Sequence, residues 1–181
     1  HASSKHGIAI TGKNILVENC NIYDVGGCGI AMSGSVDITA SIDVKTNNIV
    51  RNNHIYNYGQ NPTVNTYMRA VEFGTRNGKN KSFGDVVTNN LIHGSDLAGG
   101  IVMKGLGQTV SRNEVYNLLH SIDDAGVLYT GRSVNEFGNR ITENYLHAFS
   151  MIENPRYSSM GVYLDDWQSG QLVTRNIIVG P

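Results

Sequence analysis

The stretch VRNNHIY at residues 50–56 recurs with variations along the whole chain. Each copy has a β-branched residue, two polar residues, an Asn, a variable residue, an aliphatic residue and then usually Tyr or His. The other copies are VENCNIY (17–23), VTNNLIH (87–93), VSRNEVY (110–116), ITENYLH (141–147) and VTRNIIV (173–179). A unit that returns in this way is typical of a repeat architecture.

A second recurring element lies between these copies. It begins with a small residue and continues with alternating aliphatic residues, a pattern that predicts a half-buried strand. Its copies are GIAI (7–10), GIAM (29–32), AVEF (70–73), GIVM (100–103), GVLY (126–129) and GVYL (161–164). Each repeat therefore supplies at least two short strands.

The shared Asn indicates how the repeats are arranged. It stands at Asn53, Asn90, Asn113, Asn144 and Asn176, and Cys20 takes its place in the first copy. A coil that stacks on itself buries its aliphatic residues against the neighbouring coils. One Asn at the same corner of each coil can form a ladder of side-chain hydrogen bonds. We predict an all-β fold, a parallel β-helix of about six coils; no segment shows the apolar spacing that an α-solenoid needs.

Length and composition bound the remaining possibilities. The 181 residues form one expected domain (1–181), a fragment of a longer protein, because neither end offers the cap that a solenoid requires. Hydrophobic residues make up 40%, charged residues 16%, and the net charge is −1, so nothing favours nucleic acid or an anionic membrane as a partner. No apolar run is long enough to span a membrane. Two cysteines, Cys20 and Cys28, are expected as free thiols.

Strand alternation predicts which side chains face solvent on the second element. The expected outward set is Glu72, Lys104, Asp124, Leu128, Thr130, Arg132, Tyr163 and Asp165, whereas Val127 and Tyr129 are expected to face the core. Such a face suits an extended polar polymer such as a polysaccharide. An ordinary solvated β-surface explains the same pattern.

Two acidic pairs, Asp123–Asp124 and Asp165–Asp166, mark the ends of neighbouring strands. They fit a functional site, where costly carboxylates are tolerated, or turns in which Asp caps the backbone. In strict register Asp124 and Asp165 lie about 20 Å apart, whereas paired glycosidase carboxylates are about 5–9.5 Å apart. Either the chain bends at Asp124, or the strands are shifted, or only one carboxylate acts.

The runs DDAGVLYTGR (123–132), GNRITENYLH (138–147) and GVYLDDWQSG (161–170) resemble right-handed parallel β-helix carbohydrate-active enzymes with a pectate-lyase-like fold. The chain is most similar to glycoside hydrolase family 141, which acts on xylan and fucose-bearing pectic side chains. The resemblance implies a secreted or periplasmic enzyme whose catalytic pair is Asp124 and Asp165, one as general acid and the other as base or nucleophile. Ser133 departs from the pattern, since relatives often carry Asp there.

The expected substrate-binding residues surround this pair: Glu72, Lys104, Arg132, Tyr163, Asp166 and Trp167. Trp167 would stack on a sugar ring, and Arg132 would bind hydroxyls or carboxylates. No histidine spacing indicates a zinc site; His93 and His147 are expected to be structural, and His120 is close enough in sequence to reach the site. The aspartates could supply some ligands for calcium, but no metal or cofactor is expected.

The sequence leaves three functions open. The first is a glycoside hydrolase acting on a plant-type polysaccharide or oligosaccharide through paired aspartates. The second is a polysaccharide lyase, for which Lys104 or Arg132 would supply the base or the cation. The third is a β-helical scaffold that binds a glycan without catalysis.

Overall fold

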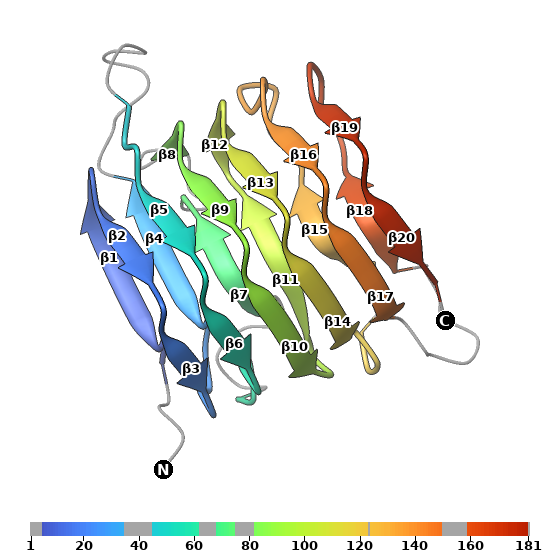
Figure 1. Ribbon diagram of the computed structural model, residues 1–181. Coiled ribbons are helices and arrows are strands. Elements are labelled where there is room, and N and C mark those ends of the chain that lie inside the picture. Colours follow the sequence, from blue (N-terminus) through green and yellow to red (C-terminus); the bar gives the residue numbers. More distant parts are fainter. Residues whose placement is uncertain are drawn as a thin grey trace.

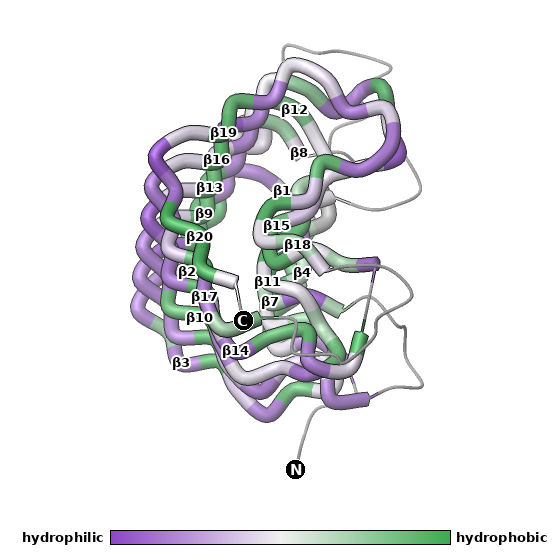
Figure 2. The backbone as a smooth tube through the Cα atoms, turned by 90° about the vertical axis from the view of Figure 1, so that its right-hand side faces the viewer, coloured by the Kyte–Doolittle hydropathy of each residue, from purple (hydrophilic) through white to green (hydrophobic). Residues whose placement is uncertain are grey.

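The computed structural model describes residues 5–34, 45–61, 68–74, 82–122, 124–149 and 159–180. Its strands follow one another in six coils, which stack from the blue to the red side of Figure 1. Figure 2 looks along the stack and shows the coils superimposed around a narrow interior. The expected β-helix of about six coils is confirmed.

Each coil contributes one strand to each of three six-stranded sheets, named here by their first strand. The β1 sheet contains β1 (Ile8–Gly12), β4 (Ile30–Gly34), β7 (Met68–Phe73), β11 (Ala98–Met103), β15 (Gly126–Thr130) and β18 (Met160–Leu164). The β2 sheet contains β2 (Leu16–Glu18), β5 (Ile49–Arg51), β9 (Val86–Thr88), β13 (Thr109–Ser111), β16 (Arg140–Thr142) and β19 (Leu172–Thr174).

The β3 sheet contains β3 (Asn21–Tyr23), β6 (His54–Tyr56), β10 (Leu91–Ser95), β14 (Glu114–Leu118), β17 (Tyr145–Phe149) and β20 (Ile177–Val179). A small fourth sheet pairs β8 (Ser82–Phe83) with β12 (Gly105–Leu106). All these pairings are parallel, so the same repeat position meets itself from coil to coil. Ile55 of β6 and Ile92 of β10 are partners in this way, and both are fully buried.

The predicted asparagine ladder runs along the corner between the β2 and β3 sheets. Asn113 shows the repeating unit: its Oδ1 accepts both the backbone N–H and the side-chain N–H of Asn90, at 3.0 and 2.9 Å. Its own Nδ2 donates to Asn144 Oδ1 at 3.0 Å and to Val87 O at 3.1 Å. The ladder begins at Cys20, whose N–H donates to Asn53 Oδ1, and the bonds continue to Asn176. Each buried amide is thereby paired with the next coil.

The residue before each ladder position turns the chain between the two sheets. Its φ lies between 54° and 60° in all six coils, in the left-handed region that Asn tolerates best. The first three coils place Asn there, and the last three place Arg112, Glu143 and Arg175. The sharp corner therefore has the same backbone geometry whichever residue occupies it.

A second ladder, which the sequence pattern did not reveal, runs along the corner between the β1 and β2 sheets. Asn48 Oδ1 accepts the N–H of Ile15 at 3.0 Å, and Asp85 Oδ1 accepts the N–H of Asn48 at 2.6 Å. Asn139 Oδ1 repeats the contact with the N–H of Gln108 at 2.9 Å. The side chain of Gln108 has no hydrogen-bond partner, so the second ladder is interrupted between Asp85 and Asn139. It escaped notice because its position holds Asn, Asp or Gln instead of one residue type.

The prediction of which side chains in GVLY (126–129) face the core was wrong. Leu128 pairs with Ile101 and Val162, is fully buried and faces the core, whereas Tyr129 pairs with Tyr163 on the outer face. The cause lies in β15: Val127, not Gly126, occupies the register row of Gly100 and Gly161, so the copy at 126–129 was taken one residue too early. A slip of one residue exchanges the two faces of a strand. Thr130, expected to face solvent, is fully buried for the same reason.

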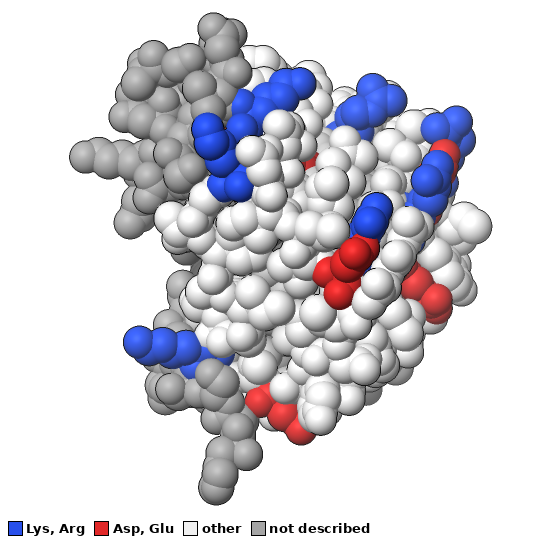
Figure 3. Space-filling view, turned by 60° about the vertical axis from the view of Figure 1, so that its left-hand side comes forward, with Lys and Arg blue, Asp and Glu red and all other residues white. Residues whose placement is uncertain are grey.

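The charged surface carries no single dominant patch on the face shown in Figure 3, where small basic and acidic clusters are separated by uncharged residues. Several of the basic side chains are paired, such as Arg51 with Glu18 at 2.7 Å and Arg112 with Glu143 at 2.8 Å. Among the described residues there is no helix with the length and apolarity that crossing a membrane requires. Cys20 and Cys28 are both free thiols, as expected.

Candidate active site

Four of the predicted site residues come together on the fifth and sixth coils. Asp124 precedes β15 and Arg132 follows it, while Tyr163 lies on β18 and Asp165 follows that strand. Tyr129, which the sequence analysis placed in the core, joins them from β15. We call these five residues, Asp124, Tyr129, Arg132, Tyr163 and Asp165, the carboxylate site.

Asp165 is the centre of the carboxylate site. Its side chain is only 10% exposed, and its Oδ2 accepts hydrogen bonds from Tyr129 Oη at 2.8 Å and Arg132 Nε at 3.2 Å. Its Oδ1 accepts the backbone N–H of Asp166 at 2.8 Å. A carboxylate with so many donors is stabilised in its ionised form.

The pKa of Asp165 follows from these contacts. Burial alone raises it, but the hydrogen bonds from Tyr129, the backbone of Asp166 and Tyr163 outweigh burial. The positive charge of Arg132 adds to them, and the pKa of Asp165 lies below its ordinary value of 3.8. Burial and then hydrogen bonding to Asp165 raise the pKa of Tyr129, so that phenol keeps its proton and donates it.

Tyr163 joins the two aspartates. Its Oη donates to Asp124 Oδ1 at 3.2 Å. Burial raises the pKa of Tyr163, and hydrogen bonding to Asp165 and to Asp124 raises it further. Because the hydroxyl that donates to Asp124 also feels the charge of Asp165, both carboxylates lie close to one phenol. The separation of about 20 Å expected from strict register does not hold.

A bend in the chain explains the short separation. Asp124 has a φ of 51°, so the backbone turns at this residue instead of continuing the line of β15. Its side chain is thereby directed to the phenol of the neighbouring coil. Of the three alternatives left open by the sequence, a bend at Asp124 is the one that the geometry supports. Asp123, the other member of the acidic pair, lies outside the described residues.

An open hollow lies beside the carboxylate site. It has a volume of about 420 Å³ and is lined by Arg132, Ser133, Val134 and Trp167. Trp167 is 70% exposed and stands in the turn after Asp166, with a φ of 65°. An exposed indole next to a charged guanidinium offers one apolar and one polar contact for a ligand. Ser133, where the resemblance led us to expect Asp, also lines the hollow.

Two predicted binding residues lie apart from the hollow. Lys104 was expected to face solvent, but it is buried: its ammonium donates to Gly131 O, is 3.6 Å from Glu136 Oε2 and lies 5.1 Å from the centre of the Tyr129 ring. Glu72 lies two coils from Tyr129 in the same register row and contacts Cys28 Sγ at 3.5 Å. Glu136, a partner that sequence reasoning missed, is 2% exposed and belongs to no repeat copy.

The histidine next in sequence to the site has a different partner. His120 Nε2 lies 2.8 Å from Asn117 Oδ1, on the exposed end of the fourth coil. Within the described ranges, no group of three or more His, Cys, Asp or Glu side chains is placed to hold a metal ion.

A model of the family described as the right-handed β-helix region matches residues 1–181 of the chain. No curated protein and no solved structure matches it. The family is one in which carbohydrate-active enzymes, both hydrolases and lyases, share a fold.

Proposed function

The chain belongs to the right-handed β-helix family, and we propose that it is a glycoside hydrolase acting on a plant-type polysaccharide or oligosaccharide, xylan or a fucosylated pectic glycan. The observation that carries the proposal is the meeting of Asp124 and Asp165 at the hydroxyl of Tyr163. Two aspartates that approach one phenol from neighbouring coils suit a pair of carboxylates that flank a scissile glycosidic bond. The substrate class rests on the resemblance of residues 123–176 to glycoside hydrolase family 141.

The two aspartates take different roles. Asp165 is held ionised by Tyr129, Tyr163 and Arg132, which suits a base or nucleophile. The general acid that protonates the leaving oxygen is then Asp124, whose contact is the single phenol of Tyr163. Trp167 and Arg132 would hold a sugar in the hollow beside the pair, with the apolar face of the ring on the indole.

Hydrolysis is favoured over β-elimination by the state of the two candidate lyase cations. A lyase needs an accessible base and a cation to neutralise the uronate carboxylate. The Lys104 ammonium is buried against Gly131 O, Glu136 and the Tyr129 ring. Arg132 is engaged by Asp165 at 3.2 Å. Lys104 is therefore not presented to an incoming uronate, and Arg132, although it lines the hollow, is already paired with a carboxylate.

The proposal is tested by the products that the full-length chain releases from xylan and pectic oligosaccharides. We expect new reducing ends without ultraviolet-absorbing unsaturated ends. Asp165→Asn and Asp124→Asn should each lower turnover by about 10²–10⁴-fold. Asp24→Asn is the matched control, since this exposed aspartate lies at the first coil and should leave turnover unchanged. Unsaturated ends would establish a lyase, and no product on any glycan would leave a binding scaffold.

The acid limb of the pH–rate profile gives a second readout. Because the pKa of Asp165 lies below 3.8, the ionised form persists into acid, and activity should fall only below that pH. A limb that falls near neutral pH would contradict the role given to Asp165.

A further inference from the structure

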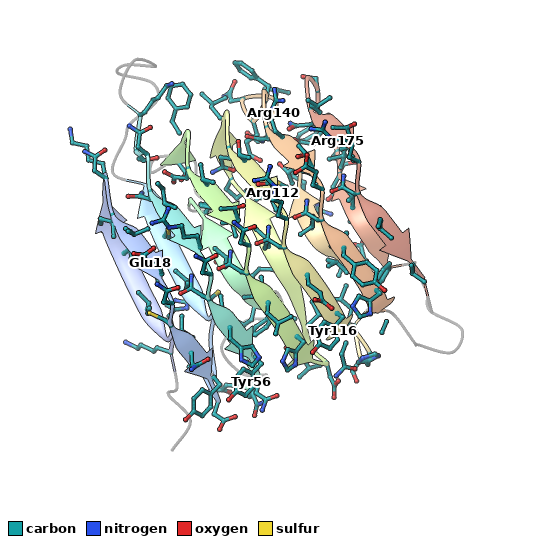
Figure 4. The ribbon with its side chains drawn as sticks, viewed as in Figure 1. Glu18, Tyr56, Arg112, Tyr116, Arg140 and Arg175 are labelled. Carbon is teal, nitrogen blue, oxygen red and sulfur yellow. The ribbon has the colours of Figure 1, made fainter. Side chains whose placement is uncertain are left out.

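The outer face of the β3 sheet carries two rows of side chains that take no part in the carboxylate site. One row is a stack of planar rings whose centroids are 4.8 to 5.4 Å apart: Tyr23, Tyr56, His93, Tyr116 and His147. The other row, two residues earlier in each strand, contains Asn21, His54, Leu91, Glu114 and Tyr145. In Figure 4, Tyr56 and Tyr116 mark β6 and β14, the strands on either side of β10, which carries His93.

The two rows meet at a pair of histidines on neighbouring coils. The Nε2 atoms of His54 and His93 are 2.8 Å apart, and the ring centroids are 5.0 Å apart. Tyr56 packs against both imidazoles, at 4.5 Å from His54 and 5.4 Å from His93. Two ring nitrogens are thus held facing each other on a paired sheet at a half-buried surface. In the absence of another group, one imidazole donates an N–H to the lone pair of the other.

The same arrangement suits metal ligation. Imidazole nitrogens bind Zn²⁺ at about 2.0–2.1 Å, which places two ligand nitrogens about 2.9 Å apart at a right angle and about 3.3 Å apart in a tetrahedron. The observed 2.8 Å matches the right-angle spacing, and because the ring centroids are 5.0 Å apart the two rings point almost directly at each other. Each ring must therefore turn by roughly 35–45° to direct its Nε2 lone pair at a shared ion. Imidazole is also a good ligand for Cu²⁺ and Ni²⁺.

We propose that His54 and His93 form a binding site for one divalent transition-metal ion. The ion takes the place of the hydrogen bond between the two Nε2 atoms. The donor imidazole moves its proton from Nε2 to Nδ1, so both Nε2 lone pairs face the ion and no proton is lost. The site is independent of the carboxylate site, which lies on the β1 sheet.

Glu114 is the nearest candidate for a third ligand. It lies one coil beyond His93, its charge acts on that imidazole, and its Oε1 is 3.2 Å from His147 Nε2. Its side chain is 47% exposed, so it has room to turn toward the pair. The described side chains form no preassembled cluster of three ligands. Two imidazoles therefore supply the fixed part of the site, and Glu114 or water completes the coordination.

The test is a titration of the tag-free full-length protein with Zn²⁺ alone, in which calorimetry measures the stoichiometry and the affinity. We expect one ion per chain, with binding at least tenfold weaker in His54→Gln and in His93→Gln. The double variant should bind no more weakly than the weaker single variant, because each imidazole is needed for the chelate. His120→Gln is the matched control, since His120 is exposed and its partner is an amide.

A second readout does not depend on any variant. Cu²⁺ added to the wild-type protein should give an electron paramagnetic resonance spectrum with hyperfine splitting from two imidazole nitrogens. Three results would each overturn the proposal. The single variants could bind Zn²⁺ as tightly as the wild type, or His120→Gln could weaken Zn²⁺ binding as much as they do. The Cu²⁺ spectrum could show hyperfine splitting from only one nitrogen. The pair would then be only a hydrogen bond between stacked coils.

Discussion

The asparagine ladder and the carboxylate site are both networks of buried or half-buried polar groups, and they differ in how the chain supplies them. In the ladder every coil contributes the same amide at the same corner, so Asn113 meets Asn90 below and Asn144 above with the same bonds. In the carboxylate site two neighbouring coils share only the Tyr129–Tyr163 pair, and the charged residues come from different positions. The repeating network satisfies the backbone of the fold, and the network that breaks the repeat gathers charge at one place.

This difference predicts that the two networks fail in different ways. Asn113→Ala should lower the free energy of unfolding by about 3–5 kcal/mol, because the backbone and side-chain N–H groups of Asn90 and the carbonyl of Val87 lose their buried partners. Equilibrium denaturation measures the loss. Asn176→Ala, at the last coil where the ladder is half-buried, should cost less than half as much. A loss below about 1 kcal/mol at Asn113 would contradict the importance of the ladder.

Tyr163→Phe tests the opposite behaviour. Removing the hydroxyl separates Asp124 from Asp165, and we expect kcat to fall by about 10–100-fold. The free energy of unfolding should change by no more than about 1.5 kcal/mol, since the phenol is only half-buried. Tyr145→Phe, an exposed phenol on β17, is the control and should change neither quantity. Full activity in Tyr163→Phe would show that the shared hydroxyl does not organise the pair.

The second ladder offers a pH-dependent comparison at Asp85. Burial raises the pKa of Asp85 above 3.8 despite hydrogen bonds from Thr46 and Asn48. The folded state therefore holds a proton more tightly than the unfolded state, and stability falls as the pH rises from 3.8 through the raised pKa. Asp85→Asn restores the residue type found at Asn48 and Asn139. It should remove this fall, so the variant should be the more stable protein at pH 7.

Denaturation of the wild type and Asp85→Asn between pH 4 and pH 7 measures this effect as a difference. The difference should grow with pH in favour of the variant. A difference that stays constant across this range would show that Asp85 is not the titrating group.

The smallest expected effect concerns the corner residue before the ladder. Arg112 has a φ of 54°, where Asn is better tolerated, and its ion pair with Glu143 is exposed and therefore weak. Arg112→Asn should raise the free energy of unfolding by about 0.5 kcal/mol. Arg112→Ala, which keeps the backbone cost and loses the ion pair, should lower it. Equal changes in the free energy of unfolding for the two variants would show that the backbone conformation at Arg112 does not contribute.

The difference between repeating and non-repeating contacts also explains how much of the structure could be predicted from the sequence. The coil count, the strand positions and the ladder were predicted because the Asn and the aliphatic residues return in every copy. The second ladder was missed because its position holds Asn48, Asp85 and Gln108 in turn. Tyr129 was assigned to the wrong face because Gly126 was taken as the small residue that opens its copy, whereas Val127 occupies that register position.

Only part of the carboxylate site could be predicted from the sequence, for a further reason. Asp124 and Asp165 were identified from the resemblance, but their approach depends on a backbone bend at Asp124 that alternation cannot express. The burial of Lys104 depends on Glu136, which lies outside every repeat copy. Contacts made between a loop and a coil leave no periodic signal in the chain.

The most direct test of this account measures stability and turnover on the same preparation of Asp165→Asn. We expect a folded protein whose denaturation remains cooperative and whose hydrolysis of xylan and pectic oligosaccharides is lost. A variant that is folded and fully active would contradict the assignment of Asp165. A variant that unfolds as readily as Asn113→Ala would show that the carboxylate site, like the ladder, serves the fold.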